Sequence, residues 1–528
     1  MLLLLSCAQP PAPEPLDPPG LVEIFVEPSA VELVTGSASN EPIQFSATGV
    51  YDDGLEEPLE LVEWSLSNRS AGDLDEDGLF LPTEDNGGIT WVTARLDGVE
   101  GSATVSLVYT DALVEDGVDP GLFDGEVSGE REFWLYPPDG VNLPRNTPSI
   151  RFMWQDQGAS AYRLRFRSDV TDLSVYTASN NWTADVETWQ RIVATNAGGS
   201  VEVQLEASIV GTVVQDTPRT LWVNRMDATG SIVYWSTTAN GFKEIPYGGE
   251  ATDFLTSNET GRCQGCHVIS SRGDVAFTYD GGNGQMGIKE VSDLSDVTTD
   301  ASLLGNFKAY SPDGEWLVST YYGGLRLHDG LTGAYLGAIP LSSPVTMPSW
   351  SPDGGQLVVV TAASISSDWA FTGGSLATIG VTGPGTFGDV EVLYTPPAGE
   401  NAYFPEFSPD GHWIVFNRST GDSYDDVDAT VWILGRDGGE PIGLVNANDV
   451  GQLTNSWPRW GPLPDDEVLW LTFSSKRAYG DLISGTPQIW VAAFDPERAK
   501  AGEDPSYAAF WLPGQSIDQN NHIPVWAP

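Results

Sequence analysis

Three copies of one short pattern decide the fold: "AYSPDGEWLVS" at residues 309–319, "SWSPDGGQLVVV" at 349–360 and "EFSPDGHWIVF" at 406–416. Each copy joins an aromatic residue, the tetrapeptide Ser-Pro-Asp-Gly and a short apolar run. In Pro-Asp-Gly the proline fixes φ, the aspartate accepts hydrogen bonds from local backbone amides, and the glycine takes a positive φ. The pattern therefore predicts a tight turn between two neighbouring strands, repeated along the chain.

Degenerate copies extend the repeat in both directions. They are "VISSRGDVAF" at 268–277, "RWGPLPDDEVLWLTF" at 459–473 and "PVWAP" at 524–528. The residue before each turn gives a common reference position, occupied by Ile269, Tyr310, Trp350, Phe407, Trp460 and Trp526. These residues are 40 to 66 positions apart, which suits one four-stranded unit each.

The repeat resembles the TolB-like, WD-repeat-like β-propeller, and this resemblance implies six blades over residues 231–528. The last unit ends with the chain, so its remaining strands must come from elsewhere. We expect "GSIVYWSTTANGFKEIPYG" at 230–248 to supply them, because a ring closed in this way leaves no exposed edge between blades.

Two further β regions precede the propeller. Residues 21–110 resemble the bacterial Ig-like group 2 domain through "ATGVYDDG" (47–54), "VEWSLSN" (62–68) and "GSATVSL" (101–107), which implies a spacer or adhesion module. Residues 131–228 resemble a fibronectin type III sandwich, with an apolar strand ending in Trp154 followed by "AYRLRF". Its aromatic residues, namely Trp154, Tyr162, Trp182 and Trp189, are expected in the core. The predicted fold class is all-β: two sandwiches followed by a six-bladed propeller.

An acidic loop in the first region has the spacing of a calcium site. In "DLDEDGLFLPTE" (73–84), the residues Asp73, Asp75, Asp77 and Glu84 match positions 1, 3, 5 and 12 of an EF-hand loop. An EF-hand loop joins two helices, whereas this one joins strands. The alternative is a plain β-hairpin turn rich in Asp and Gly.

The charge balance restricts the partners. The 528 residues include 74 acidic and 24 basic ones, giving a net charge of −50. A field of that sign repels phosphate backbones and anionic lipid headgroups. We therefore expect no nucleic acid, and contact with a membrane only through a lipid anchor.

The first 20 residues carry the expected anchor. The apolar run ending in Leu4-Leu5-Ser6-Cys7 resembles the lipobox of bacterial lipoproteins, in which the cysteine is lipidated, and a Pro-rich tether follows. This resemblance implies an outer-membrane lipoprotein of the bacterial cell envelope that faces the periplasm or the cell surface.

"CQGCH" at 263–267 has the spacing that attaches a c-type haem. Cys263 and Cys266 would hold the porphyrin, and His267 would ligate its iron. The reference positions place Cys266 in one set with Phe307, Met347, Phe404, Trp457 and Ile523. Because the innermost strands of a propeller line its axial channel, we expect this set to ring one mouth of the channel, where ligands bind.

If haem is present, His522 or Met347 is the expected sixth ligand, or the iron position is open. His328 and His412 are expected at the surface. Two alternatives to haem stay open for the motif: a Cys263–Cys266 disulfide, and a zinc or other metal site.

Few sequence features indicate an enzyme. The chain has no Gly-x-Ser-x-Gly elbow, no appended α/β-hydrolase domain and no Gly-rich phosphate loop before a helix. We therefore expect an exported, lipid-anchored binding protein with a protein or small-molecule ligand at the propeller mouth, with a c-type haem serving electron transfer. The alternatives are a non-redox adhesion module that carries the disulfide, and a haem enzyme such as a peroxidase.

Overall fold

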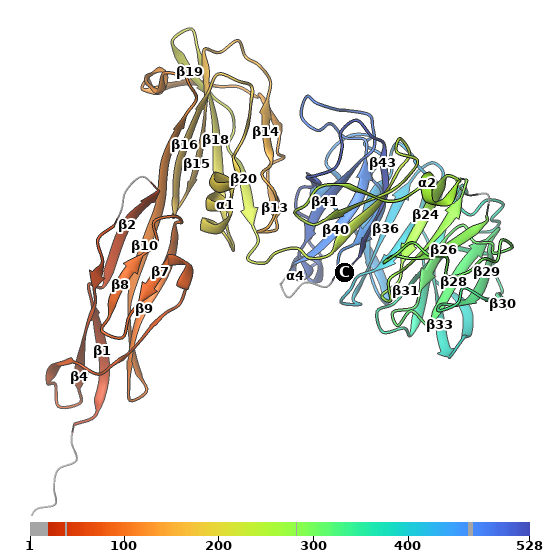
Figure 1. The fold of residues 1–528 in the computed structure, drawn as a ribbon, viewed down its shortest axis with the longest axis horizontal. Coiled ribbons are helices and arrows are strands. Elements are labelled where there is room, and N and C mark those ends of the chain that lie inside the picture. The colour runs from red at the N-terminus through yellow and green to blue at the C-terminus, as the bar shows by residue number, and fades with distance from the viewer. Residues whose placement is uncertain (1–18, 37–39, 281, 283, 463–467, 528) are drawn as a thin grey trace, which may run out of the picture. The chain divides into compact units, whose positions relative to one another are not determined.

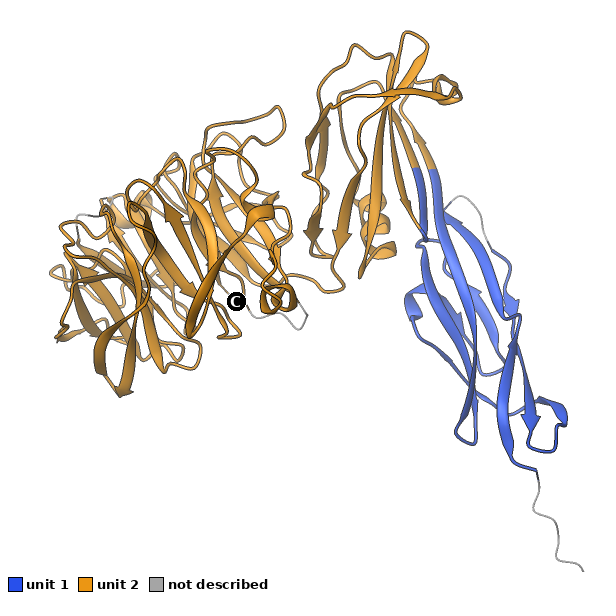
Figure 2. Ribbon diagram, turned by 180° about the vertical axis from the view of Figure 1, so that it is seen from behind, with its two compact units in different colours: residues 1–111, 169–173 blue, residues 112–168, 174–528 orange. Residues whose placement is uncertain are grey.

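The computed structural model describes residues 19–36, 40–280, 282, 284–462 and 468–527. Its regular structure is almost entirely β, as predicted (Figure 1). The chain divides into two compact units, residues 1–111 with 169–173 and residues 112–168 with 174–528 (Figure 2). Cys7 and the Pro-rich tether up to residue 18 lie outside the described residues. No helix in the described part of the chain is long and apolar enough to cross a membrane.

The first unit is a β-sandwich whose sheets share one core. Its strands are β1 (Leu21–Glu27), β2 (Ala30–Gly36), β3 (Ile43–Gln44), β4 (Ser46–Tyr51), β5 (Glu56–Leu59), β6 (Glu63–Leu66), β7 (Gly72–Leu74), β8 (Leu79–Pro82), β9 (Gly88–Leu96) and β10 (Val99–Val114). Side chains alternate between buried and exposed along β9, so every second residue enters the core. Phe45, Phe80, Val92 and Val105 belong to that core and are at most 1% exposed.

The predicted acidic loop is a hairpin turn between β7 and β8. The carboxylate of Asp75 accepts the backbone N–H groups of Asp77 (3.0 Å) and Leu79 (2.8 Å), so it closes the turn itself. Within the described ranges, no group of three or more His, Cys, Asp or Glu residues is placed to hold a metal ion. Asp73, Asp75, Asp77 and Glu84 belong to no such group, and their segment contains the β7–β8 hairpin; calcium binding there stays a prediction.

Residues 127–223 hold further strands and one helix. The elements are β11 (Val127–Glu130), β12 (Trp134–Tyr136), β13 (Val141–Leu143), β14 (Arg151–Trp154), β15 (Ala161–Ser168), β16 (Thr171–Thr177), β17 (Asn181–Thr183), α1 (Val186–Thr195), β18 (Gly199–Ile209), β19 (Thr212–Gln215) and β20 (Arg219–Val223). Trp154, Tyr162 and Trp189 are buried, as expected for core residues, and Trp182 is half-buried against Phe152. The helix α1 was not anticipated; the side chain of Asp185 caps its first turn by accepting the backbone N–H of Thr188.

Residues 231–527 form six sheets, which we number as blades 1 to 6. Blade 1 contains β24 (Gln264–Ile269), β25 (Asp274–Tyr279) and β26 (Met286–Glu290); blade 2 contains β27 (Lys308–Tyr310), β28 (Trp316–Tyr321), β29 (Gly324–Asp329) and β30 (Tyr335–Ile339). Blade 3 contains β31 (Val345–Trp350), β32 (Gln356–Thr361), β33 (Ser375–Gly383) and β34 (Thr386–Tyr394); blade 4 contains β35 (Asn401–Phe407), β36 (Trp413–Ser419), β37 (Thr430–Gly435) and β38 (Gly438–Gly443). Blade 5 contains β39 (Ser456–Trp460), β40 (Leu469–Ser475), β41 (Gln488–Phe494) and β42 (Phe510–Trp511). These sheets confirm the predicted propeller, with blade 1 built from three described strands instead of four.

Blade 6 closes the ring as expected. Its innermost strand is β43 (Asn521–Ala527), and its other strands are β21 (Ser231–Ser236), β22 (Gly241–Pro246) and β23 (Thr252–Thr256). Trp526 is paired with Ile232, and His522 with Trp235. The two ends of the propeller therefore share one sheet, which removes an unpaired edge from the ring.

The Ser-Pro-Asp-Gly turns have the predicted chemistry. In blade 3 the hydroxyl of Ser351 donates to the carboxylate of Asp353 (2.6 Å), which also accepts the N–H of Gly355 (2.9 Å). Gly354 takes φ +68°, which is the conformation that glycine tolerates best. The Ser351 hydroxyl, the Gly355 amide and Arg436 together lower the pKa of Asp353 to about 2.

Candidate functional site

Five of the six innermost strands share an unusual backbone conformation three residues before the reference position. Cys266, Met347, Phe404, Trp457 and Ile523 have φ values between +48° and +59°. Side chains rarely adopt this left-handed region, because Cβ crowds the backbone. In all five strands the pairing with the neighbouring strand of the same blade shifts register at this point, which defines a β-bulge.

These bulges gather the predicted ring of side chains into a plug across the channel. Phe404 and Trp457 stack with ring centroids 3.7 Å apart, and Phe307 lies 5.9 and 5.8 Å from them. Met347, Ile523 and Cys266 pack in the same cluster. The five apolar members are at most 6% exposed. The ring that we expected at an open mouth is therefore the buried floor of a cavity.

The cavity above this plug has a volume of about 250 Å³ and is the first candidate site. Its wall contains the residues directly before the reference positions, namely Val268, Ala309, Ser349, Glu406, Arg459 and Val525. Four of these six are apolar or small, and the two charged ones lie on blades 4 and 5; Lys308 of blade 2 also lines the cavity. This set of positions was not predicted from the sequence.

Glu406 and Arg459 place opposite charges on the cavity wall. Their side chains approach to 3.8 Å, and each is about a fifth exposed, at 26% and 17%. The Glu406 carboxylate also accepts the backbone N–H of Trp460 (2.6 Å), and Arg459 donates to the carbonyl of Pro458 (2.9 Å). Burial raises the pKa of Glu406, although the nearby guanidinium opposes this effect. Neither group uses all its hydrogen-bonding capacity in these contacts, so a ligand can engage both.

His267 and Lys308 occupy the position that proline fills in the other four blades. His267 is 3% exposed, packs on Phe242 with centroids 4.3 Å apart, and its Nε2 lies 3.1 Å from the carbonyl oxygen of Val233. Burial lowers the pKa of His267 to about 3, so the ring is neutral. Lys308 donates to the Cys266 and Asn306 carbonyls and to the Thr278 hydroxyl, and burial lowers its pKa to about 8.

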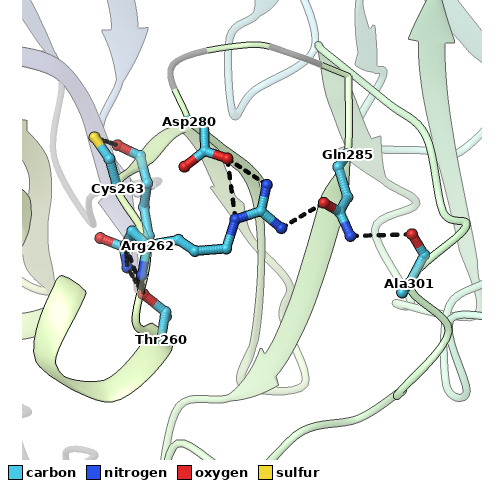
Figure 3. A network of polar contacts seen from close by, with 7 residues as sticks. Thr260, Arg262, Cys263, Asp280, Gln285 and Ala301 are labelled. Atoms are coloured by element: carbon cyan, nitrogen blue, oxygen red, sulfur yellow. Dashed lines mark hydrogen bonds and ion pairs between the residues drawn. The ribbon is translucent and has the colours of Figure 1, made fainter.

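The two cysteines of the motif have different surroundings. Both are free thiols, and burial raises the pKa of each. Cys263 lies beside Arg262, whose guanidinium contacts Asp280 and Gln285 (Figure 3). Cys266 packs against the residues of the plug. Both cysteines lie within the described part of the chain, and no disulfide joins them there.

The residues of the motif do not fit a covalent haem as they are arranged. The Nε2 of His267, which would ligate the iron, contacts a backbone carbonyl inside the blade. The sulfur of Met347 accepts the backbone N–H of Phe404 (3.3 Å) within the plug. The cavity above the plug, of about 250 Å³, is also too small for a porphyrin, although it can hold a ligand of a few heavy atoms. The arrangement of these residues therefore gives no support to the predicted c-type haem.

Three other histidines complete the set considered from sequence, and His412 is exposed, as predicted. His522 pairs with Trp235, and burial lowers its pKa to about 4. The prediction that His328 lies at the surface was wrong: its side chain is fully buried and its Nε2 contacts the Ser319 hydroxyl at 2.9 Å. His328 lies on the third strand of blade 2, a position that neighbouring blades cover in a propeller.

Comparisons with known proteins assign no family to this chain. No protein-family model matches the chain, and no curated protein matches it. A putative TolB from Agrobacterium tumefaciens shares 16% identity over 57% of this chain and 99% of its own, with a TM-score of 0.33. The hydrazine synthase of Kuenenia stuttgartiensis shares 14% identity over 48% of this chain and 67% of its own, with a TM-score of 0.33. The dihydro-haem d1 dehydrogenase NirN, in complex with DHE, shares 15% identity over 51% of this chain and 53% of its own, with a TM-score of 0.32. At these TM-scores the likenesses carry no argument, and the propeller fold rests on its six sheets.

Proposed function

We propose that this chain is an exported, lipid-anchored binding protein whose propeller takes a small polar ligand in the cavity above the plug. The observation that carries the proposal is the repeated bulge. Five residues hold a conformation that costs about 1–2 kcal/mol each. Strained residues of this kind cluster at ligand sites, and here the five residues form the floor of a cavity.

The paired charges define the class of ligand. Arg459 offers N–H donors in a planar fork that suits a carboxylate, and Glu406 accepts from an ammonium or hydroxyl group. The apolar wall between them accommodates a short aliphatic or aromatic group. A free amino acid, or the terminus of a peptide, combines these features within the available volume.

Thermal stabilisation by a panel of free L-amino acids and dipeptides tests this function. We expect at least one member to raise the melting temperature of the full chain, and Arg459→Met to weaken its binding at least tenfold. Arg436→Met is the matched control, because Arg436 pairs with Asp353 at a turn. Absence of any stabilising compound, or equal binding by Arg459→Met, would overturn the proposal.

A haem spectrum decides the redox alternative. The chain is produced in a host that matures c-type cytochromes, then denatured, and a pyridine haemochrome spectrum is recorded. Because the His267 ring is buried against Phe242, we expect no covalently retained haem. A c-type haemochrome band that is lost in Cys263→Ser would restore the electron-transfer function.

A further inference from the structure

A second cavity, of about 350 Å³, lies on the other side of the plug. Trp235, Trp369, Tyr424 and Asp422 line it, and we call these four residues the aromatic cage. Cys266 lines both this cavity and the one above the plug. Tyr424 meets the plug edge-on, with its ring centroid 5.9 Å from that of Trp457 and an interplanar angle of 90°.

Two loops that form the cage are fixed to each other. Trp369 lies between β32 and β33 of blade 3, and Tyr424 lies between β36 and β37 of blade 4. The hydroxyl of Ser423 donates to the carbonyl of Trp369 (3.1 Å) and accepts the N–H of Phe371 (3.1 Å). The buried carboxylate of Asp368 accepts the N–H groups of Tyr322 and Gly323, which holds the first loop on blade 2. The cage is therefore organised before any ligand binds.

The rings of the cage have no cation of the protein's own. Elsewhere in the chain Arg262 lies over Tyr279 at 4.3 Å, and Arg418 over Trp432 at 4.4 Å. Among the described residues no Arg or Lys lies over the three rings of the cage, and none lines its cavity. These rings therefore have no cationic partner among the described residues, and a cation from outside can fill that role.

We propose that the aromatic cage binds a methylated ammonium group, and that this site is distinct from the proposed site above the plug. Three aromatic side chains and one carboxylate are the combination that recognises a bulky cation with little hydration. One oxygen of Asp422 accepts the backbone N–H of Tyr424 (3.0 Å), which fixes this carboxylate on the loop that carries Tyr424. The net charge of −50 raises the local concentration of any such cation.

Isothermal titration with choline and with 3,3-dimethyl-1-butanol, its uncharged isostere, tests the site. Because only choline carries the charge, we expect it to bind at least tenfold more tightly than the isostere. Trp369→Leu and Asp422→Asn should each weaken choline binding about tenfold. Trp91→Leu, at an exposed indole of the first unit, and Asp481→Asn, at an exposed carboxylate of blade 5, should change it less than twofold.

Three outcomes would overturn the proposal. The first is no heat of choline binding to the full chain. The second is binding of the isostere within twofold of choline, which would make the cavity a generic apolar site. The third is choline binding that falls equally in Asp422→Asn and Asp481→Asn, which would assign the effect to net charge alone.

Discussion

The left-handed bulge at Met347 allows the strain in the plug to be measured. Met347 has φ +52° and is 4% exposed, whereas Leu357, on the second strand of the same blade, is 0% exposed and is not among the residues with positive φ. Each site is changed to alanine and, separately, to glycine. The comparison within each pair removes the cost of losing the large side chain, about 2–5 kcal/mol.

The two sites should respond oppositely to the step from alanine to glycine. At Leu357 this step loses a buried methyl group, about 0.8 kcal/mol, and adds about 0.4–1 kcal/mol of backbone entropy, so glycine is less stable by about 1.5 kcal/mol. At Met347 the same losses are offset by relief of about 1–2 kcal/mol of left-handed strain, so the difference is about zero. The expected contrast between the two sites is therefore about 1–2 kcal/mol.

Calorimetric unfolding of the full chain measures this contrast. A difference of that size shifts the melting temperature of a large domain by roughly 2–4 °C per kcal/mol. The comparison is valid when all four variants unfold in the same transition as the unmodified chain. If Met347→Gly is less stable than Met347→Ala by as much as at Leu357, the bulge holds no strain and the argument from strain to ligand site fails.

Three further predictions concern other parts of the chain. Burial lowers the pKa of His267 to about 3 and that of His328 to about 4. The stability that these neutral rings contribute is therefore complete above about pH 6.5, and below that pH it falls by about 1.4 kcal/mol per group and pH unit. Urea unfolding at pH 7 and at pH 5 should show this loss, and His328→Gln should reduce the pH dependence. Asp353→Asn should lower the free energy of unfolding by about 1 kcal/mol, because it weakens the Ser-Pro-Asp-Gly turn. Denaturant titrations measure this loss, and an equal loss in Asp389→Asn, at an exposed position, would refute the prediction. Cys7→Ala should release the protein from the membrane fraction whereas Ser6→Ala should not, and unchanged fractionation of Cys7→Ala would remove the lipobox from the proposed function.

The propeller could be predicted because its main signals are local. Pro-Asp-Gly specifies a turn through the φ preferences of proline and glycine, and the spacing between turns fixes the number of blades. The partner of β43 could be predicted because a single unit at the C-terminus needed strands and one unassigned β segment preceded blade 1. Both features follow from the order of residues along the chain alone.

The bulges could not be predicted from residue type, since Met347, Phe404 and Trp457 are not residues that favour positive φ. One signal was available. In four blades the residue after the bulge is proline, which has no N–H and is tolerated at bulges because it leaves no unpaired donor. His267 and Lys308 replace that proline in blades 1 and 2, and both line the cavity above the plug while contacting backbone carbonyls.

The charged pair and the aromatic cage were missed for different reasons. Glu406 and Arg459 are 53 positions apart, and only the relative rotation of blades 4 and 5 brings their side chains together. Trp235, Trp369 and Tyr424 come from one strand and two loops whose lengths differ between blades, so no fixed spacing relates them. Such sites depend on tertiary geometry that a repeat pattern does not encode.

Cys266 connects the two candidate sites because its side chain lies in the wall that separates them. A change in its volume alters the plug, which forms the floor of the upper cavity and adjoins Tyr424 of the aromatic cage. Packed side chains of this kind transmit a displacement, since the interior has little free volume. Occupation of one cavity that moves Trp457 would therefore alter the other, and the Cys-x-x-Cys-His segment would act through the packing of Cys266 instead of through iron chemistry.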